Sequence, residues 1–306
     1  MKYYAGLDIG GSNGRIKVQS AEGTVLGEFQ ANGCSINTDG YEKSRQRYRE
    51  LVLPVLDKLV LSPEDCEGIC VAASGVDSPD ILDNCREIFK DMGFHGQNIR
   101  ILNDCEVFLH LTEEPALVLV SGTGSICYGR DMNHTVYRTG GWNHIISDEG
   151  SGFELGLELV RASADELDGR NKTQCLASMI TDACHAHTLE KLNTFINENL
   201  FEKSRIAALA EVGYRAACEG DAVALHIHNK CGDRLFRLIQ DTLNKMEIDR
   251  ETEMKLWLWG SILVKNAIVR KRLIQKVREH APFLDPGVPV MNALDAALGI
   301  AATARH

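Results

Sequence analysis

Residues 3–19, YYAGLDIGGSNGRIKVQ, read as two β-strands joined by a glycine-rich turn. Residues 3–9 are mostly apolar, and residues 15–19 alternate between polar and apolar side chains, which is the pattern of a strand with one buried face. The segment between them, 10–14, consists of residues that favour tight turns. A third strand is predicted at 24–30, so the chain opens with three antiparallel strands in meander order.

The same plan recurs further along the chain. Residues 116–129, ALVLVSGTGSICYG, again give two short strands around a glycine-rich turn, here Ser121-Gly-Thr-Gly124, and a third strand is predicted near 135–138. Two copies of one supersecondary unit, each opening one half of the protein, indicate a duplicated fold with the ligand bound between the halves. We therefore predict an α/β protein with two domains, 1–114 and 115–306.

The remaining elements are predicted more coarsely. Helical periodicity surrounds Pro54, which is expected to kink or split that helix. A helical insertion in the second domain is predicted over about 153–250, and a final helix at about 292–304 is expected to pack back toward the first domain. Short buried strands are predicted at 70–74 and 100–103, and each of them ends in polar residues.

The composition is that of an ordinary globular protein. Of the 306 residues, 44% are apolar and 25% are charged, which excludes a disordered chain, a collagen and a coiled coil. Asp and Glu number 43 against 33 Lys and Arg, so the net charge is −10 and a polyanion would be repelled. Neither nucleic acid nor a membrane is therefore expected as a partner.

The distribution of apolar residues and cysteines indicates the compartment. No apolar stretch approaches the ~20 residues of a membrane span, and the N-terminus lacks the apolar core of a signal peptide. The ten cysteines form no Cys-x-x-Cys pair, which indicates reduced thiols rather than a disulfide framework or a zinc site. We expect a cytoplasmic protein whose tryptophans, Trp142, Trp257 and Trp259, fill the core.

The two glycine-rich turns are candidates for an anion-binding site. Glycine permits close approach of the backbone, so that successive N–H groups can surround a phosphate. The chain contains no Gly-Lys-Ser/Thr, and neither turn reads G-x-G-x-x-G, which argues against a Walker loop and a dinucleotide-binding site. Either turn alone could be a simple hairpin. Their matching positions in a repeat favour the functional interpretation.

Four acidic residues stand at the ends of predicted strands or turns: Asp8, Asp77, Asp104 and Asp148. In α/β proteins the carboxyl ends of the strands face the crevice in which ligands bind, although each acid could instead cap the helix that follows it. Beside a polyphosphate, Asp8 makes chemical sense only with a divalent cation between them, which suggests Mg²⁺ held through water. Asp104 could accept the proton of an attacking hydroxyl group.

Several motifs occur in the order found in a known family. They are Asp8-Ile-Gly-Gly-Ser-Asn-Gly14, Ser74-Gly-Val-Asp77, Asn103-Asp104, Ser121-Gly-Thr-Gly-Ser125, Gly140-Gly-Trp142 and Asp148-Glu-Gly-Ser-Gly152. Over most of its length the chain therefore resembles the N-acetylglucosamine kinases and the related activator ATPases, and the last two motifs are the most specific. These proteins belong to the actin-like ATPase superfamily. The resemblance implies two ribonuclease-H-like domains that close over ATP.

The resemblance also implies roles for individual residues. Asp104 would be the catalytic base, and Asp8 would lie beside Mg²⁺. ATP would be bound by Asp8, Gly10, Gly11, Ser12, Asn13, Gly122, Thr123, Gly124, Ser125, Gly260 and Ser261. The sugar would contact Asn37, Ser74, Gly75, Asp104, Thr123, Gly141 and Asp148.

The activity implied by the resemblance is ATP-dependent phosphorylation of an amino sugar, with O6 of N-acetylglucosamine as the expected acceptor. Glucosamine, N-acetylmuramic acid and other hexoses are alternative acceptors. An activator ATPase would need clustered cysteines for an iron–sulfur cluster, which the sequence lacks. A non-enzymatic actin-like protein would need neither Asn37 nor Asp104.

The start of the final helix departs from the family pattern. Family members commonly have a glycine-rich segment there, whereas this chain has Asn292-Ala-Leu-Asp295. Asp295 could reshape the base of the nucleotide pocket, or it could cap the helix. We further expect a homodimer.

Overall fold

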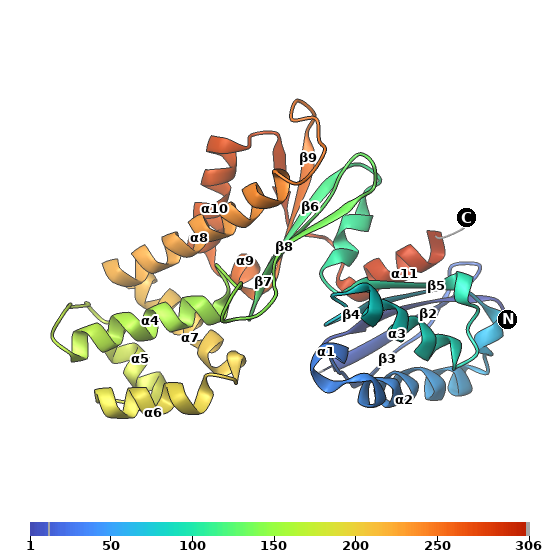
Figure 1. The fold of residues 1–306 in the computed structure, drawn as a ribbon, viewed down its shortest axis with the longest axis horizontal. Helices are drawn as coiled ribbons and strands as arrows, with labels where there is room; N and C mark the ends of the chain where they lie inside the picture. Colours follow the sequence, from blue (N-terminus) through green and yellow to red (C-terminus); the bar gives the residue numbers. More distant parts are fainter. Residues whose placement is uncertain (12, 304–306) are drawn as a thin grey trace. The chain divides into compact units, whose positions relative to one another are not determined.

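The computed structural model describes residues 1–11 and 13–303, and it separates into two compact units, shown as ribbons in Figure 1. The first unit contains Met1–Glu113 and the segment from Val290 onward, and the second contains Glu114–Pro289. The chain therefore returns to the first unit for its last helix. Each unit has its own hydrophobic core.

The first unit is built on a five-stranded sheet. Its strands are β1 (Tyr3–Ile9), β2 (Asn13–Ser20), β3 (Val25–Asn32), β4 (Cys66–Ala73) and β5 (Ile99–Asn103). They lie in the order β3-β2-β1-β4-β5; β1 is antiparallel to β2 and parallel to β4, which is parallel to β5. The carboxyl ends of β1, β4 and β5 therefore meet at one edge, where α/β sheets present functional residues.

Helices cover both faces of this sheet (Figure 1). The helical segments of the unit are α1 (Ile36–Asp39), α2 (Tyr41–Leu59), η1 (Pro63–Asp65), α3 (Pro79–Lys90), η2 (Gly96–Asn98), η3 (Glu106–Leu111) and α11 (Ala293–Thr303). Buried residues of α2 and α3 share a core with alternate residues of β1, whereas α11 packs on β1 and β4 from the other face. Glycines make that approach possible, because a Cβ at Gly6 would lie 2.4 Å from the backbone nitrogen of Leu298.

The helix around Pro54 is not split. α2 continues through this residue, and buried side chains on both sides of it, Leu51, Val52, Val55 and Leu56, hold consecutive turns against the core. Of the two expected effects of Pro54, a kink or a split, the split was therefore wrong. Burial of an apolar face, which supplies most helical stability in proteins, outweighs the one backbone hydrogen bond that proline removes.

The second unit repeats the sheet topology of the first. Its strands are β6 (Ala116–Ser121), β7 (Ser125–Arg130), β8 (Val136–Gly140), β9 (Met254–Trp259) and β10 (Leu284–Gly287). Their order, β8-β7-β6-β9-β10, places the antiparallel meander and the two parallel strands as in the first sheet. The prediction of a duplicated α/β fold is thus confirmed.

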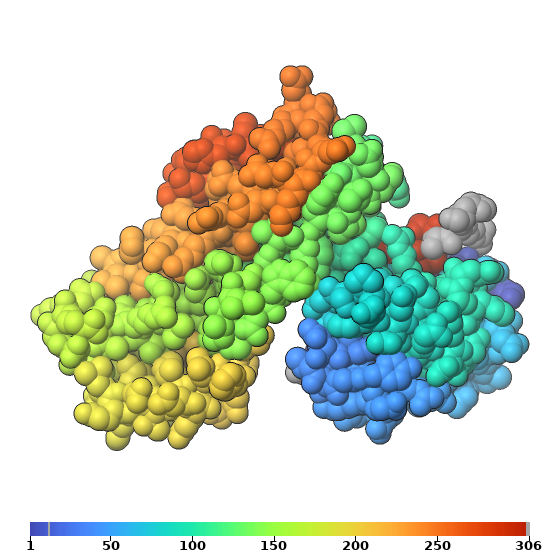
Figure 2. Space-filling view, viewed as in Figure 1, coloured from blue at the N-terminus to red at the C-terminus, as the bar shows by residue number. Residues whose placement is uncertain are grey.

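A large helical region follows the meander of the second unit. Its helices are α4 (Gly152–Leu167), α5 (Leu176–Cys184), α6 (Leu189–Asn199), α7 (Lys203–Cys218) and α8 (Ala222–Leu243), and α9 (Ser261–Lys265) and α10 (Ala267–His280) follow β9. In the view of Figure 2, helices coloured from yellow-green to orange make up much of the visible face of this unit. No helix within residues 1–11 and 13–303 has both the length and the apolar character needed to cross a membrane.

One buried carboxylate joins two of these helices. The side chain of Asp221 caps α8 through Oδ1, which accepts hydrogen bonds from the N–H groups of Val223 and Ala224, both at 3.0 Å. Its Oδ2 accepts hydrogen bonds of 2.8–2.9 Å from three N–H groups at the start of α5, those of Gln174, Cys175 and Leu176. Burial by itself would raise the pKa of Asp221, but these bonds hold the pKa below its usual value.

All ten thiols are free. Seven of them are buried, Cys105 and Cys175 are partly exposed, and Cys218 is exposed. Burial raises the pKa of the Cys70 thiol to about 12 and that of Cys85 to about 11. Thiols held in the neutral form are weak nucleophiles, so these groups act as small apolar side chains.

Candidate active site

Three carboxylates lie close together at the carboxyl edge of the first sheet. Asp8 belongs to the end of β1, Asp77 follows β4 and Asp104 follows β5. Burial raises the pKa of Asp104 to about 6, and the negative charges of Asp8 and Asp77 add to this effect. Asn103 holds the loop after β4 to the loop after β5, because its Nδ2 donates to Asp77 at 3.2 Å and its Oδ1 accepts from the N–H of Cys105 at 3.0 Å.

Asp8 is paired with a cation that the sequence analysis did not single out. Arg15 lies directly opposite Asp8 in the β1–β2 ladder, and its Nη2 donates to Oδ2 of Asp8 at 2.6 Å. Both side chains line a surface hollow of about 510 Å³ together with Gly10, Asn13 and Gln30. The hairpin register was the signal in the sequence that could have found Arg15, because residues at equal distances from a turn face each other.

The first glycine turn exposes its backbone at Gly11. Gly10 donates its N–H to the carbonyl of Asn13 at 2.9 Å, and a Cβ at Gly11 would meet no described atom within 4 Å. The fold around Gly11 therefore does not itself require glycine. By contrast, a Cβ at Gly33 would lie 2.0 Å from the carbonyl oxygen of Gly10, so the backbone of Gly33 lies directly against the turn. Ser12, also predicted here, lies outside the described residues.

Three residues predicted to contact sugar come together in the first unit. Ser74 donates its N–H to the carbonyl of Ile9 at 2.8 Å, which ties the end of β4 to the end of β1. Gly75 has φ +81°, and a Cβ there would lie 2.4 Å from Oγ of Ser35 and 3.0 Å from Cβ of Asn37. The structure therefore places Asn37 beside Ser74 and Gly75, at the edge of the sheet that also bears Asp104.

In the second unit, Asp148 lies against the second glycine turn. A Cβ at Gly124 would lie 3.1 Å from Oδ2 of Asp148, and the N–H of Ser125 donates to Oδ1 at 3.4 Å. Burial raises the pKa of Asp148, and the Ser125 bond with the nearby positive charge of Lys203 opposes this shift. A side chain at position 124 would press on this carboxylate and oblige it to shift, a constraint that the sequence did not reveal.

A hydrogen bond joins the two ends of the loop before Asp148, and the loop exposes an aromatic ring. Gly141, with φ +72°, donates its N–H to the carbonyl of Ser147 at 2.9 Å. Trp142 is 61% exposed, and the guanidinium carbon of Arg138 lies 3.9 Å from its ring centroid. The expectation that Trp142 fills the core was wrong, because the closed loop lifts the ring onto the surface, where a cation–π contact holds it. Trp257 and Trp259 are partly buried.

A cavity of about 390 Å³ lies within the second unit. Its walls come from the turn after β6, from the start of α4, from α7 and from α9, and its lining includes Gly122, Thr123, Gly152, Glu211, Tyr214, Ser261, Lys265 and Asn266. Gly260, with φ +92°, brings α9 against the turn, since a Cβ there would lie 2.3 Å from the carbonyl oxygen of Ser121. Gly122, Thr123 and Ser261 were predicted for nucleotide binding, and the cavity brings them together.

Four polar residues of this cavity were missed by the sequence analysis: Glu211, Tyr214, Lys265 and Asn266. Glu211 and Tyr214 stand one turn apart in a helix of ordinary amphipathic pattern, which gives no signal of a site. Lys265 ends α9, and Asn266 caps α10 by accepting a hydrogen bond from the N–H of Val269 at 3.2 Å. Only the fold brings these residues to the glycine turn.

Asp295 fastens the last helix to the first sheet. Its Oδ1 accepts a hydrogen bond from Nζ of Lys17 in β2 at 2.6 Å, and its N–H is bound by Oδ1 of Asn292 at 2.9 Å. Asn292, not Asp295, therefore supplies the capping side chain. The ion pair gives Asp295 a role in anchoring α11 that the sequence analysis did not consider.

Comparison with known proteins agrees with this architecture. Residues 5–304 match the family model described as the BadF/BadG/BcrA/BcrD ATPase family. The chain belongs to this family. Over 253 residues it is 31% identical to an N-acetylmuramic acid/N-acetylglucosamine kinase of Clostridium acetobutylicum, a match that covers 82% of each protein. An N-acetyl-D-glucosamine kinase of Dictyostelium discoideum is 22% identical over 290 residues, 91% of each protein.

Solved structures of related proteins have the same fold as this ATPase-family chain. A structure from Chromobacterium violaceum, provisionally described as an N-acetylglucosamine kinase, superposes with a TM-score of 0.77 at 20% identity and covers 98% of this chain and 99% of its own. The glucokinase of Balamuthia mandrillaris, solved with glucose, gives a TM-score of 0.54 at 17% identity, with coverages of 98% and 93%. The resemblance inferred from the sequence motifs is confirmed.

Proposed function

We propose that this chain is an ATP-dependent amino-sugar kinase that phosphorylates N-acetylglucosamine at O6. The observation that carries the proposal is Asp104, a carboxylate with a pKa raised to about 6 at the sheet edge where Asn37, Ser74 and Gly75 also lie. A base is most effective when its pKa lies near the working pH, and its ionised form predominates at pH 7. Membership of an ATPase family with sugar-kinase relatives supports the same activity.

In the proposed reaction, O6 of the sugar attacks the γ-phosphorus of ATP. A new O6–P bond forms, the bond between the γ-phosphorus and the β–γ bridging oxygen breaks, and ADP leaves with that electron pair. The O6 proton passes to the carboxylate of Asp104. Phosphoryl transfer depends mainly on positioning and on charge stabilisation, so the remaining residues are assigned to binding.

The nucleotide is assigned to the glycine turns and to the cavity of the second unit. The cavity volume of about 390 Å³ is in the range of small-molecule sites, and Gly122 and Thr123 line it beside polar residues of α7 and α9. We assign the adenosine moiety to this cavity. The bare backbone at Gly11 suits a phosphate oxygen, and Arg15 is the cation beside that turn.

Magnesium is the cofactor that such a reaction requires. Within the described residues, no group of three or more His, Cys, Asp or Glu side chains is arranged to hold a metal ion. This fits Mg²⁺, which is commonly bound by one or two carboxylates together with substrate phosphates rather than by a protein cage. Asp8 would hold the ion, which would neutralise phosphate charge.

The sugar is assigned to Asn37, Ser74, Gly75 and Asp104 in the first unit and to Thr123, Gly141 and Asp148 in the second. Asp148 is a partly desolvated carboxylate, which suits it to accept hydrogen bonds from sugar hydroxyl groups. A second candidate acceptor is N-acetylmuramic acid, because the exposed cation of Lys203 acts on Asp148 and would attract a carboxylated sugar.

A coupled assay of ADP release across four sugars tests the proposal. We expect the highest kcat/KM with N-acetylglucosamine, then lower values for glucosamine, N-acetylmuramic acid and glucose, and phosphorus NMR should place the phosphate on O6. Fastest turnover of N-acetylmuramic acid would change the substrate to the second candidate. Sugar-independent ATP hydrolysis, together with bound iron and absorbance near 400 nm, would instead support an activator ATPase.

The pH dependence of kcat/KM should report the base. Because its folded pKa is raised to about 6, Asp104 is protonated and inactive below that pH and ionised above it, so kcat/KM should rise through about pH 6. Asp77→Asn removes one of the two negative charges that raise this pKa, while its amide oxygen can still accept from Asn103. The rise of kcat/KM on the acid side of the pH profile, its acid limb, should therefore move to lower pH.

The matched control for this experiment is Asp83→Asn, which removes an exposed acid of α3 that pairs only with Arg86 among the described ion pairs. Its acid limb should coincide with that of the wild type. An acid limb that does not move in Asp77→Asn would show that the titrating base is not near Asp77, and would count against Asp104.

A further inference from the structure

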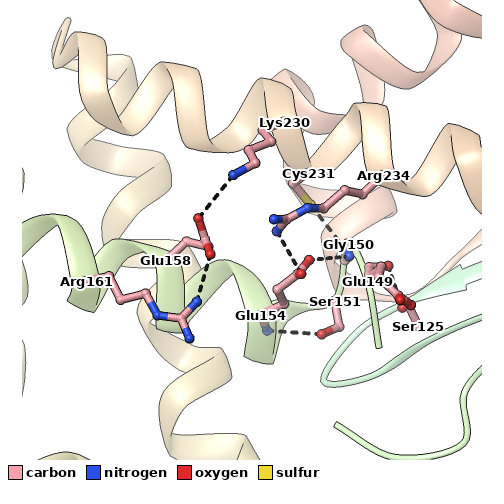
Figure 3. A network of polar contacts seen from close by, with 10 residues as sticks. All are labelled: Ser125, Glu149, Gly150, Ser151, Glu154, Glu158, Arg161, Lys230, Cys231 and Arg234. Carbon is pink, nitrogen blue, oxygen red and sulfur yellow. Dashed lines mark hydrogen bonds and ion pairs between the residues drawn. The ribbon is translucent and has the colours of Figure 1, made fainter. Parts of the chain in front are cut away.

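We propose that Glu154 and Arg234 are positioning residues that hold Asp148 and the second glycine turn in their binding geometry, an inference that rests on the proposed kinase function. Neither residue is among those that line the cavity. They act through Gly150, two residues beyond Asp148, at the centre of the network in Figure 3.

The segment 148–152 is bound to the second glycine turn at several points. Gly152 donates its N–H to the carbonyl of Gly122 at 2.7 Å, and the hydroxyl of Ser121 donates to the carbonyl of Gly150 at 2.8 Å. The hydroxyl of Ser125 donates to the carbonyl of Glu149 at 2.7 Å. Because the loop and the turn are linked in this way, a displacement of one will displace the other.

Glu154 links the segment 148–152 to α8. Its Oε2 accepts a hydrogen bond from the N–H of Gly150 at 2.7 Å, and its Oε1 pairs with Nη1 of Arg234 in α8 at 2.7 Å. The hydroxyl of Ser151, the N-cap of α4, accepts from the N–H of Glu154 at 3.1 Å. Serine followed three residues later by glutamate is the pattern of a capping box. Here, however, the carboxylate binds the N–H of Gly150, the residue before the N-cap, rather than that of the N-cap itself.

Gly150 is also seated directly on α8. It has φ +77°, and a Cβ there would lie 2.5 Å from Cγ of Leu235. The thiol of Cys231 donates to its carbonyl at 3.3 Å. Both backbone polar groups of Gly150 are thus satisfied by side chains, and Glu154 is the acceptor for the N–H. Without that carboxylate the N–H would lose its partner in a partly buried place, so the loop would shift to find another.

The next turn of α4 provides a matched control. Glu158 pairs with Arg161 at 2.9 Å and with Lys230 of α8 at 3.6 Å (Figure 3). Its side chain is 22% exposed and that of Glu154 is 24% exposed, so the two carboxylates have similar surroundings. Both link α4 to α8, but only Glu154 bonds to the loop. Replacing each of them separates the effect on the loop from loss of an interhelical ion pair.

Glu154→Met, Glu154→Gln and Glu158→Met test the proposal. Methionine keeps the approximate shape and removes both oxygens, so Glu154→Met should raise the KM for sugar and the KM for ATP by roughly tenfold each. Glutamine retains an oxygen that can accept from Gly150 but loses the charge that pairs with Arg234, so Glu154→Gln should raise both KM values less than Glu154→Met does. Glu158→Met should leave both KM values unchanged. Loss of folded protein alone would lower the apparent kcat and leave KM unaltered.

Two measurements that need no turnover complete the test. Calorimetric ADP affinity should fall in Glu154→Met and not in Glu158→Met, and deuterium uptake should increase in the peptide that contains Gly150. Equal KM values, ADP affinities and uptake in the two methionine variants would overturn the proposal, as would equal damage in Glu154→Gln and Glu154→Met. If Glu154→Met does not fold, Arg234→Met replaces it, with the same direction of change expected.

The same measurements distinguish failure of the kinase assignment from failure of the positioning role. If the wild-type protein releases no ADP in response to any sugar, the kinase assignment fails, but ADP affinity and deuterium uptake still decide whether Glu154 holds the loop. If the wild type is an active kinase and the variants do not differ, the kinase assignment stands and the positioning role is wrong.

Discussion

Replacing Asp104 with asparagine should lower kcat on the order of 10²-fold or more while nucleotide affinity stays near the wild-type value. A primary hydroxyl group is a poor nucleophile at neutral pH, and a carboxylate within ~3 Å can orient it and take its proton during transfer. Asparagine has a similar shape but cannot accept that proton. Steady-state kinetics with saturating sugar, together with calorimetric ADP binding, measure the two effects separately.

The same variant should not be less stable than the wild type at pH 7. The pKa of Asp104 in the folded protein, about 6, lies above the usual value for aspartate, so the folded state favours the protonated form. Ionisation therefore costs stability as the pH rises through 4 to 6, and the neutral amide avoids that cost. Lower activity without a lower melting temperature is the pattern of a residue kept for function rather than for folding.

Asp148→Asn provides the comparison, since Asp148 is assigned to sugar binding and should mainly raise the sugar KM. Near wild-type kcat in a well-folded Asp104→Asn protein would show that Asp104 is not the base. The mechanism would then have to be rebuilt around Asp77, which lies close enough to raise the pKa of Asp104, or around Asp148.

The duplicated meander was readable from the sequence because hydrophobic alternation and glycine turns are local signals. Both copies were located, and the fold class followed from them. β10 was not predicted, because Leu284–Gly287 contains Pro286, which reads as a turn residue. The strand lies at the edge of its sheet, where proline is tolerated. Its identity depends on pairing with β9, a contact that no local pattern records.

The helical region was predicted as a whole, but its division was not. The sequence predicted one helical insertion over about 153–250, whereas α4, α5, α6, α7 and α8 are separate helices. The connection between α6 and α7 contains neither glycine nor proline, so it carries no strong signal. The helices end there because their apolar faces must turn to reach a common core, which is a property of the tertiary structure.

Some residues of the candidate site could likewise be predicted from local sequence, and others could not. Asp8 and Asp104 were found because an acid at the end of a buried strand is a local feature. Arg15 could have been found from the hairpin register. Glu211 and Tyr214 lie far in sequence from Gly122, and only the packing of α7 beside the second glycine turn brings them together. Ser151 and Glu154 have the spacing of an ordinary capping box, so the bond from Gly150 to the Glu154 carboxylate leaves no signal of its own in the sequence.

Replacing Asp221 with alanine should destabilise the second unit by roughly 4 kcal/mol, because five N–H groups at the starts of α5 and α8 lose a buried acceptor. A lost N-cap alone costs ~1 kcal/mol. Thr188→Ala is the matched control, since Thr188 caps α6 through one N–H, that of Lys191 at 3.4 Å. Urea unfolding can be followed by tryptophan fluorescence, because all three tryptophans belong to the second unit.

The pH dependence of the same unfolding transition distinguishes a charged cap from simple packing. The folded pKa of Asp221 is lowered, so its stabilising contribution is complete above the unfolded value of ~3.9 and is lost as the pH falls through the folded value. The difference in stability between the wild type and Asp221→Ala should therefore be constant from pH 7 to about pH 5 and should shrink at lower pH. Asp221→Asn keeps one oxygen but turns an amide group toward N–H donors, so it should be intermediate at pH 7. If Asp221→Ala loses no more stability than Thr188→Ala, or if its deficit does not change at low pH, the carboxylate does not join α5 to α8 as the hydrogen bonds indicate.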